Sequence, residues 1–250
     1  MIIKRLFFIV IILLLLFLFF LFESIKQVPE EANNHNDNSK TNKEVIPWGQ
    51  AYVGIDKEIR NSKVKVAILD SGINSNHSDL KNKVTKSYNV IRSTNSTSDD
   101  FGHGTNIAGI ITANHNSHGI IGVSPNVEIY DIKVLNAEGK GEIDDVLTAL
   151  LWAYKNDVDI INISFGFSTN YSELQEMIDL LVSEGIIIVA ASGNNLGQEV
   201  DYPARYPNVI SVGSIDKDGN IDTLSAQGKI DVLLQGKIYL QQVCLGDTKK

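Results

Sequence analysis

Short runs of apolar residues, many of them β-branched, recur along the chain after residue 46. They cover residues 64–69, 127–134, 158–163, 186–190 and 209–212. Nearly every position in these runs is apolar, which is typical of strands buried on both faces of a sheet. Residues 142–155 and 172–184 instead repeat apolar side chains at spacings of three and four, which predicts helices with one apolar face. Gly185 then predicts a left-handed helix end.

Alternating strands and helices predict a fold of the α/β class. The expected architecture is a doubly wound, mostly parallel sheet with helices on both faces. In such sheets, ligands bind beyond the carboxyl ends of the strands. Residues that directly follow a predicted strand are therefore the candidates for a functional site.

An unbroken apolar run from Leu6 to Phe22 follows Lys4 and Arg5. Its 17 residues are close to the length that crosses a hydrocarbon core. Residues 19–23 offer no pair of small residues for signal cleavage, so residues 1–22 are predicted to be an uncleaved signal anchor. The two basic residues favour a cytoplasmic amino end, with the rest of the chain outside the cell membrane. A cleaved signal and a secreted domain are the alternative.

Residues 23–45 are polar and contain no aromatic side chain, which predicts a flexible linker. Residues 46–250 then form the single folded domain. The chain has a net charge of −8, and residues 1–45 carry five basic and five acidic side chains, so the excess lies entirely in the domain. Such a surface is a poor partner for nucleic acid. The single cysteine, Cys244, excludes an internal disulfide.

Three polar motifs stand at the ends of predicted strands or at the start of a helical run. Asp70 follows the first strand, and an aspartate there is also a common helix or turn cap. His103 lies between two glycines ahead of the apolar run 107–112, and its imidazole is suited to general base catalysis. A metal ligand or a surface histidine is the alternative. Asn194 follows the strand 186–190, where its amide is able to donate to an anionic oxygen or simply form a turn.

Taken together, these motifs resemble those of the subtilisin-like serine endopeptidases, from about residue 45 to residue 238. The segments that carry the resemblance are Asp70-Ser71-Gly72, Gly102-His103-Gly104-Thr105, Ala191-Ser192-Gly193-Asn194, the loop 119–125 and the stretch 203–213. The resemblance implies hydrolysis of peptide bonds by an Asp–His–Ser triad. His103 would be the general base, Asp70 would orient it and Asn194 would donate to the oxyanion.

The same resemblance implies that two extended segments bind a peptide or protein substrate between them. These segments are Gly139-Lys140-Gly141 and Ser164-Phe165-Gly166. The bulky Phe165 favours hydrophobic substrate side chains, unless it packs in the core instead.

Members of this family often hold a structural calcium ion in the loop after the histidine helix. The matching oxygen donors here are the side chains of Asp79 and Asn116 and the main-chain oxygens of Asn114, His118 and Ile120. A solvated polar loop without an ion is the alternative.

The serine of the family lies in a Gly-Thr-Ser segment, and no such segment occurs in these 250 residues. The chain is therefore interpreted as a truncated peptidase that is inactive as written, since loss of the nucleophile costs about 10⁶ in turnover. A large apolar cavity or an exposed apolar patch is expected on the flank of the sheet, since the missing part would be a core helix. The alternative function is a pseudoprotease that binds peptides without cutting them.

Overall fold

The computed structural model describes residues 44–53, 63–91 and 96–235. By its internal contacts the chain divides into two units, Met1–Thr41 and Asn42–Lys250, and all described residues belong to the second unit.

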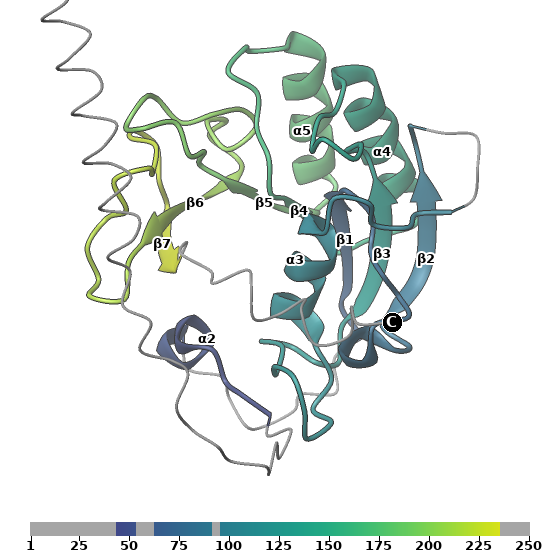
Figure 1. Ribbon diagram of the computed structural model, residues 1–250. Helices are drawn as coiled ribbons and strands as arrows, with labels where there is room; N and C mark the ends of the chain where they lie inside the picture. Colours follow the sequence, from purple (N-terminus) through teal and green to yellow (C-terminus); the bar gives the residue numbers. More distant parts are fainter. Residues whose placement is uncertain (1–43, 54–62, 92–95, 236–250) are drawn as a thin grey trace, which may run out of the picture. The chain divides into compact units, whose positions relative to one another are not determined.

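A seven-stranded sheet forms the centre of this unit (Figure 1). The strands are β1 (Lys65–Asp70), β2 (Val84–Asn89), β3 (Glu128–Lys133), β4 (Ile160–Ile163), β5 (Ile187–Ala191), β6 (Ile210–Ile215) and β7 (Val232–Gln235). Their order is β2-β3-β1-β4-β5-β6-β7, and each neighbouring pair is parallel. The chain builds outward from β1 in both directions, so β1 ends at the point in the sheet where an α/β fold binds its ligand.

Helices cover both faces of the sheet. They are α3 (His103–Thr112), α4 (Ile143–Lys155) and α5 (Ser172–Ser183), with a short helix α2 (Trp48–Val53) and a 3-10 turn at Ser78–Leu80. Successive residues of β1 point to opposite faces: Val66 and Ile68 pack with Ala108 of α3, whereas Leu69 packs with Leu150 of α4. This confirms the predicted α/β class with a parallel sheet and helices on both faces.

The predicted strands and helices agree with the observed ones to within a few residues, and Gly185 has the expected positive φ of 89°. The sequence pattern missed α2, β2 and β7. Strand β2 is an edge strand whose middle residues are exposed and polar, so it lacks the apolar run by which the other strands were recognised.

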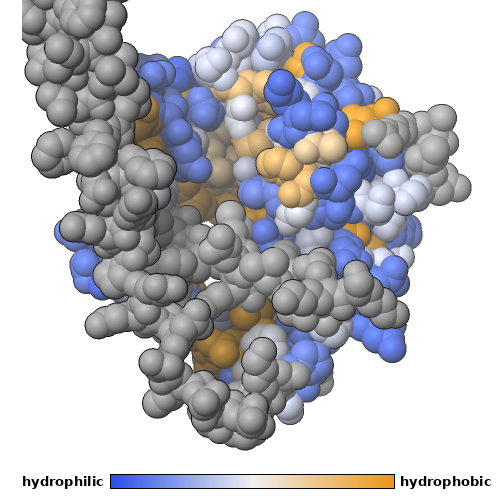
Figure 2. Space-filling model, viewed as in Figure 1, coloured by the Kyte–Doolittle hydropathy of each residue, from blue (hydrophilic) through white to orange (hydrophobic). Residues whose placement is uncertain are grey.

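Strands β5 and β6 differ from the prediction of burial on both faces. Their residues alternate between buried and partly exposed, and Ile187 and Ile210 are 48% and 39% exposed. Figure 2 shows hydrophobic residues exposed over this part of the sheet. Val232 of β7, 40% exposed, lies on the same face, because it pairs with Val212, and the three residues form an apolar patch on the flank of the sheet, as expected from the sequence.

The predicted anchor, residues 1–22, and most of the predicted linker lie outside the described residues. Within the described part of the chain, no helix has both the length and the apolar character needed to span a membrane. Val45, at the end of the predicted linker, lies opposite Ile120 in a parallel bridge: its N–H donates to the Gly119 carbonyl and its carbonyl accepts from the Ile121 N–H. The described fold therefore already includes Val45, which the sequence assigned to the linker. The sequence gives no local sign of this pairing, because the partner lies 75 residues away.

One carboxyl group is enclosed in the core between β3 and the loop that precedes α3. Asp131 is 1% exposed, the Thr97 hydroxyl donates to its Oδ2, and its Oδ1 has no hydrogen-bond partner in the described structure. Burial raises the pKa of Asp131 from 3.8 to about 7. The folded protein therefore holds a proton here that the unfolded chain releases at lower pH.

Asp131 should make the protein less stable as the pH rises from about 4 to above 7. In this range the folded state binds more protons than the unfolded state, so the free energy of unfolding falls with pH. Asp131→Asn replaces the carboxyl by a neutral group of the same shape, and should raise the free energy of unfolding at pH 8 by about 2 kcal/mol or more. Urea denaturation at several pH values measures this effect. Asp218→Asn, at an exposed loop position, should keep the wild-type pH dependence, and an unchanged dependence in Asp131→Asn would contradict the prediction.

Candidate active site

The Asp70 carboxylate and the His103 imidazole are in direct contact at the carboxyl end of β1. His103 Nδ1 lies 2.9 Å from both carboxylate oxygens of Asp70. Asp70 is 1% exposed, and the Ser71 N–H donates to its Oδ1 at 2.7 Å. The hydrogen bond to Asp70 is the main cause that raises the pKa of His103 above 6.5, and the negative charges of Asp70 and Asp99 add to it, whereas burial opposes it. A proton held on Nδ1 by Asp70 leaves Nε2 as the basic nitrogen of the ring.

Glycines on both sides of His103 permit this close approach. Gly102 precedes α3 with a φ of 90°, in the left-handed region that favours glycine. A Cβ on Gly104 would collide with the carbonyl oxygen of Gly72 and lie 3.1 Å from the Cβ of Asp70. The absence of side chains therefore lets the start of α3 pack directly against the loop that follows β1.

Asp99 connects the loop before α3 to the end of β1. Its Oδ1 accepts hydrogen bonds from the Ser71 hydroxyl at 2.8 Å and the Gly102 N–H at 2.7 Å. Its Oδ2 accepts from the N–H and the hydroxyl of Thr105, in the first turn of α3. The Ser71 hydroxyl in turn accepts from the N–H of Gly104 at 3.0 Å. This carboxylate thus fixes the residues on both sides of His103. The sequence analysis missed Asp99, although an aspartate shortly before a helix is a recognisable cap.

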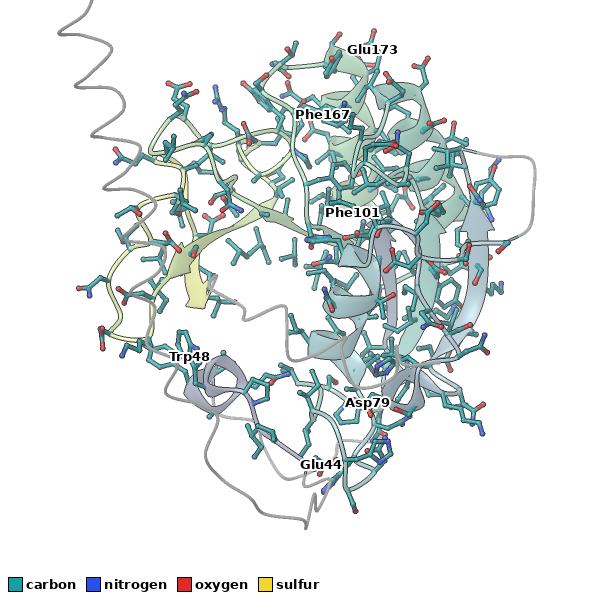
Figure 3. The ribbon with its side chains drawn as sticks, viewed as in Figure 1. Glu44, Trp48, Asp79, Phe101, Phe167 and Glu173 are labelled. Carbon is teal, nitrogen blue, oxygen red and sulfur yellow. The ribbon has the colours of Figure 1, made fainter. Side chains whose placement is uncertain are left out.

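The segment Gly139-Lys140-Gly141 lies beside the histidine loop. A Cβ on Gly139 would come within 2.7 Å of the Phe101 ring, so the ring occupies the space that a side chain would fill. The rings of Phe101 and His103 have centroids 6.3 Å apart. The structure therefore brings this predicted substrate-binding segment next to the predicted general base; Phe101 itself lies at the carboxyl end of the central strands (Figure 3).

The second predicted substrate-binding segment, Ser164-Phe165-Gly166, directly follows β4, the neighbour of β1. The hydroxyl of Ser164 accepts a hydrogen bond from the Asn162 amide at 2.8 Å. Phe165 is partly buried against the core and meets Phe167 edge to face, with ring centroids 6.1 Å apart. Its ring thus makes the core contact that the sequence left open as an alternative, and its contact with a substrate side chain stays a prediction.

Asn194 follows β5, so it lies at the same edge of the sheet as Asp70, with β4 between their strands. Its side chain is exposed, and no hydrogen bond to its amide forms among the described residues. Gly193, directly before it, has a φ of 109°. The amide is thus free to donate to a bound group, and its contact with one stays a prediction.

The predicted calcium loop folds around the carboxylate of Asp79, which is 3% exposed. The Asn116 amide donates to Asp79 Oδ1 at 3.0 Å, and the Ile120 N–H lies 3.3 Å from Oδ2. A Cβ on Gly119 would collide with this carboxylate, so glycine is needed where the loop wraps around it. Asn114 is tied to the same place by its N–H, which donates to the Asp79 carbonyl at 2.7 Å.

Sequence analysis missed a second carboxylate at this loop, because it assigned Glu44 to the linker. Glu44 Oε1 accepts from the N–H groups of Asn116 and Ser117 at 2.8 and 3.2 Å, and Oε2 lies 2.8 Å from His115 Nε2. His118 Nε2 lies 3.6 Å from Asp79 Oδ1. Glu44 and Asp79 lie at the end of the sheet opposite Phe101 (Figure 3).

This loop contains the kinds of oxygen ligand that calcium prefers, namely two carboxylates, a side-chain amide and main-chain carbonyl groups. In the described residues no group of three or more His, Cys, Asp or Glu side chains has a geometry that could hold a metal ion. An ion bound here would therefore depend on main-chain oxygens, and the Asn116 amide, whose nitrogen now faces Asp79, would have to turn its oxygen inward.

Comparison with known proteins gives a consistent result. The model of the subtilase family matches residues 61–248. Alkaline elastase YaB of Bacillus sp. (strain YaB) is 38% identical over 201 residues, which are 78% of this chain and 52% of the elastase. Subtilisin BL and subtilisin Savinase of Lederbergia lenta are 38% and 37% identical over 208 residues, which are 81% of this chain and 76% of each relative. The chain thus spans about half the length of the elastase and about three quarters of the two subtilisins.

The raised pKa of His103 should be measurable on the protein itself. We expect the imidazole to titrate above 6.5 in an NMR pH titration of the full chain, since Asp70 favours the charged ring. Asp70→Asn should lower this pKa, because it removes both the charge and the charge-assisted hydrogen bond that raise it. Glu173→Gln, at the exposed start of α5, should leave it unchanged. A His103 pKa that does not respond to Asp70→Asn would show that the contact is not formed in solution.

Proposed function

The chain belongs to the subtilase family, and on that premise we propose that it carries the acid–base part of a subtilisin-type serine endopeptidase. The observation that supports this most directly is the contact of His103 Nδ1 with both carboxylate oxygens of Asp70. Such a contact leaves Nε2 to take the proton of a serine hydroxyl and return it to the leaving amine. The buried Asp70 keeps the ring in that tautomer and stabilises its cation.

The remaining parts of the site lie along one edge of the sheet. Asn194 donates its amide to the oxyanion that forms when the peptide carbonyl is attacked; loss of this kind of donor in subtilisin costs about 10² to 10³ in turnover. The segments 139–141 and 164–166 follow β3 and β4, on either side of β1. They hold the substrate backbone as an added strand, which makes an extended peptide the substrate class.

The nucleophile is the part that these 250 residues do not supply, since they contain no Gly-Thr-Ser segment. We propose that hydrolysis belongs to a polypeptide that includes this segment and that the chain as given binds peptides without cutting them. A pseudoprotease that only binds peptides is the second candidate, since the segments 139–141 and 164–166 would serve it equally well.

We further propose that the domain works on the outer side of the cell membrane. This rests on the 17-residue apolar run from Leu6 to Phe22 with Lys4 and Arg5 before it. If that run is cleaved, the domain is secreted.

A structural calcium ion at the loop around Asp79 is part of the same proposal. Asp79, Glu44, the Asn116 amide oxygen and the main-chain oxygens of the loop would hold it, and its role would be to neutralise these two carboxylates, both of which bind Asn116.

Calcium should therefore stabilise the protein. We expect millimolar CaCl₂ to raise the melting temperature by several degrees relative to EDTA, and Asp79→Asn to remove most of this difference. Asp159→Asn, which removes a carboxylate elsewhere in the domain, should keep the calcium response. Equal melting temperatures of the unaltered chain in CaCl₂ and EDTA would contradict the proposed ion.

A serine-directed fluorophosphonate probe tests the function. The full natural gene product should be labelled, and Asp70→Asn should slow labelling by up to about 10⁴-fold, since the ring then takes the wrong tautomer. Asp218→Asn should label at the wild-type rate, and the 250-residue chain should not be labelled. Peptide binding by the natural product without labelling would favour the pseudoprotease, and labelling of the 250-residue chain would contradict the assignment of the nucleophile.

A further inference from the structure

Asp201 lies between the segments that follow β4 and β5. Its N–H donates to the Ser192 carbonyl at 2.9 Å, which ties it to the segment after β5. The next residue, Tyr202, exchanges two backbone hydrogen bonds with Phe167, at 2.7 and 2.8 Å, which ties it to the segment after β4. The backbone around Asp201 is therefore held on both sides at the edge of the sheet where the proposed function places the substrate.

Two glycines make room for the Asp201 side chain. A Cβ on Gly193 would collide with Asp201 Oδ2, and a Cβ on Gly166 would come within 2.6 Å of the Asp201 Cβ. Gly193 directly precedes Asn194, the proposed oxyanion donor, and Gly166 ends one of the proposed substrate-binding segments. The carboxylate thus lies beside both parts of the proposed site.

The Asp201 carboxylate is half-buried and forms no ion pair or hydrogen bond within the described residues. Arg205, four residues further on, is already engaged: its guanidinium binds Glu199 at 2.6 Å and lies 4.7 Å from the centre of the Tyr202 ring. A carboxylate that is partly removed from water is stabilised by a cationic partner, because the ion pair offsets the free energy lost with its hydration. The described part of the chain supplies none here, although it pairs Glu199 in the same segment with Arg205.

We infer that Asp201 selects substrates with a basic side chain, arginine or lysine, at the position that binds between Gly166 and Gly193. This inference rests on the proposed peptide-binding function and goes beyond it by naming the substrate class. The Phe165 ring does not argue for hydrophobic substrates instead, because it packs against the core and Phe167.

Equilibrium titration of the full chain with fluorescein-labelled peptides tests the inference. The probes are acetyl-Ala-Ala-Pro-Xaa-amides in which Xaa is arginine, lysine, citrulline or leucine. Citrulline has the shape of arginine without its charge, so it isolates the ionic contribution. We expect the arginine peptide to bind about 10 to 100 times more tightly than the citrulline peptide, the range of a charge-assisted hydrogen bond.

Asp201→Asn should abolish the preference for arginine over citrulline. Glu199→Gln is the matched control, because it removes the same unit of charge two residues away and should keep the preference. Thermal unfolding establishes that each variant is folded. Asp201→Lys is a second variant, and it should bind a glutamate peptide more tightly than the arginine peptide.

The possible failures are distinguishable. If all peptides bind equally well, or if the preference survives in Asp201→Asn, the inference is wrong while the proposed peptide-binding function stands. If Glu199→Gln removes the preference as completely as Asp201→Asn, the effect comes from net charge and the inference is again wrong. If none of the peptides binds, both the inference and the proposed function are overturned.

Discussion

The position of His103 depends on a carboxylate with which it forms no hydrogen bond. Asp99 binds the Ser71 hydroxyl on one side and Gly102 and Thr105 on the other, so it fixes the end of β1 and the start of α3 relative to each other. Each of these hydrogen bonds alone contributes about 1 to 3 kcal/mol to the stability of the folded state. Together they convert two independent chain segments into one rigid frame, in which the 2.9 Å contact between Asp70 and His103 needs no further adjustment.

This frame is possible because glycines let neighbouring groups come close to the backbone at several places. Gly104 faces the Gly72 carbonyl, Gly139 faces the Phe101 ring, and Gly193 faces the Asp201 carboxylate. A side chain at Gly104 would push apart the start of α3 and the loop after β1, and a side chain at Gly139 or Gly193 would displace the group that the glycine faces. The parallel sheet brings these loops to one edge, and the glycines set how closely they pack there.

The sequence predicted the buried parts of this protein better than its edges. The central strands and the helices were recognised because their apolar residues repeat with the period of the element, and Asp70 and His103 because they stand in motifs at strand and helix ends. Strand β2 lacks such a pattern since it is polar and exposed. Glu44, Asp99 and Asp201 were missed for another reason: each acts on residues that only the fold brings near, and no local pattern encodes such a contact.

Four aspartates illustrate how one fold handles carboxyl groups that are buried or partly buried. Asp70 is paired with an imidazole, and Asp99 is surrounded by N–H and O–H donors. Asp131 has one hydroxyl donor and a pKa raised to about 7, so it accepts a proton instead. The Asp201 carboxylate has no imidazole, N–H or O–H partner among the described residues. Because a half-buried carboxylate is costly to leave unpaired, its persistence beside Gly166 and Gly193 is best explained by a positive charge that arrives with the bound peptide.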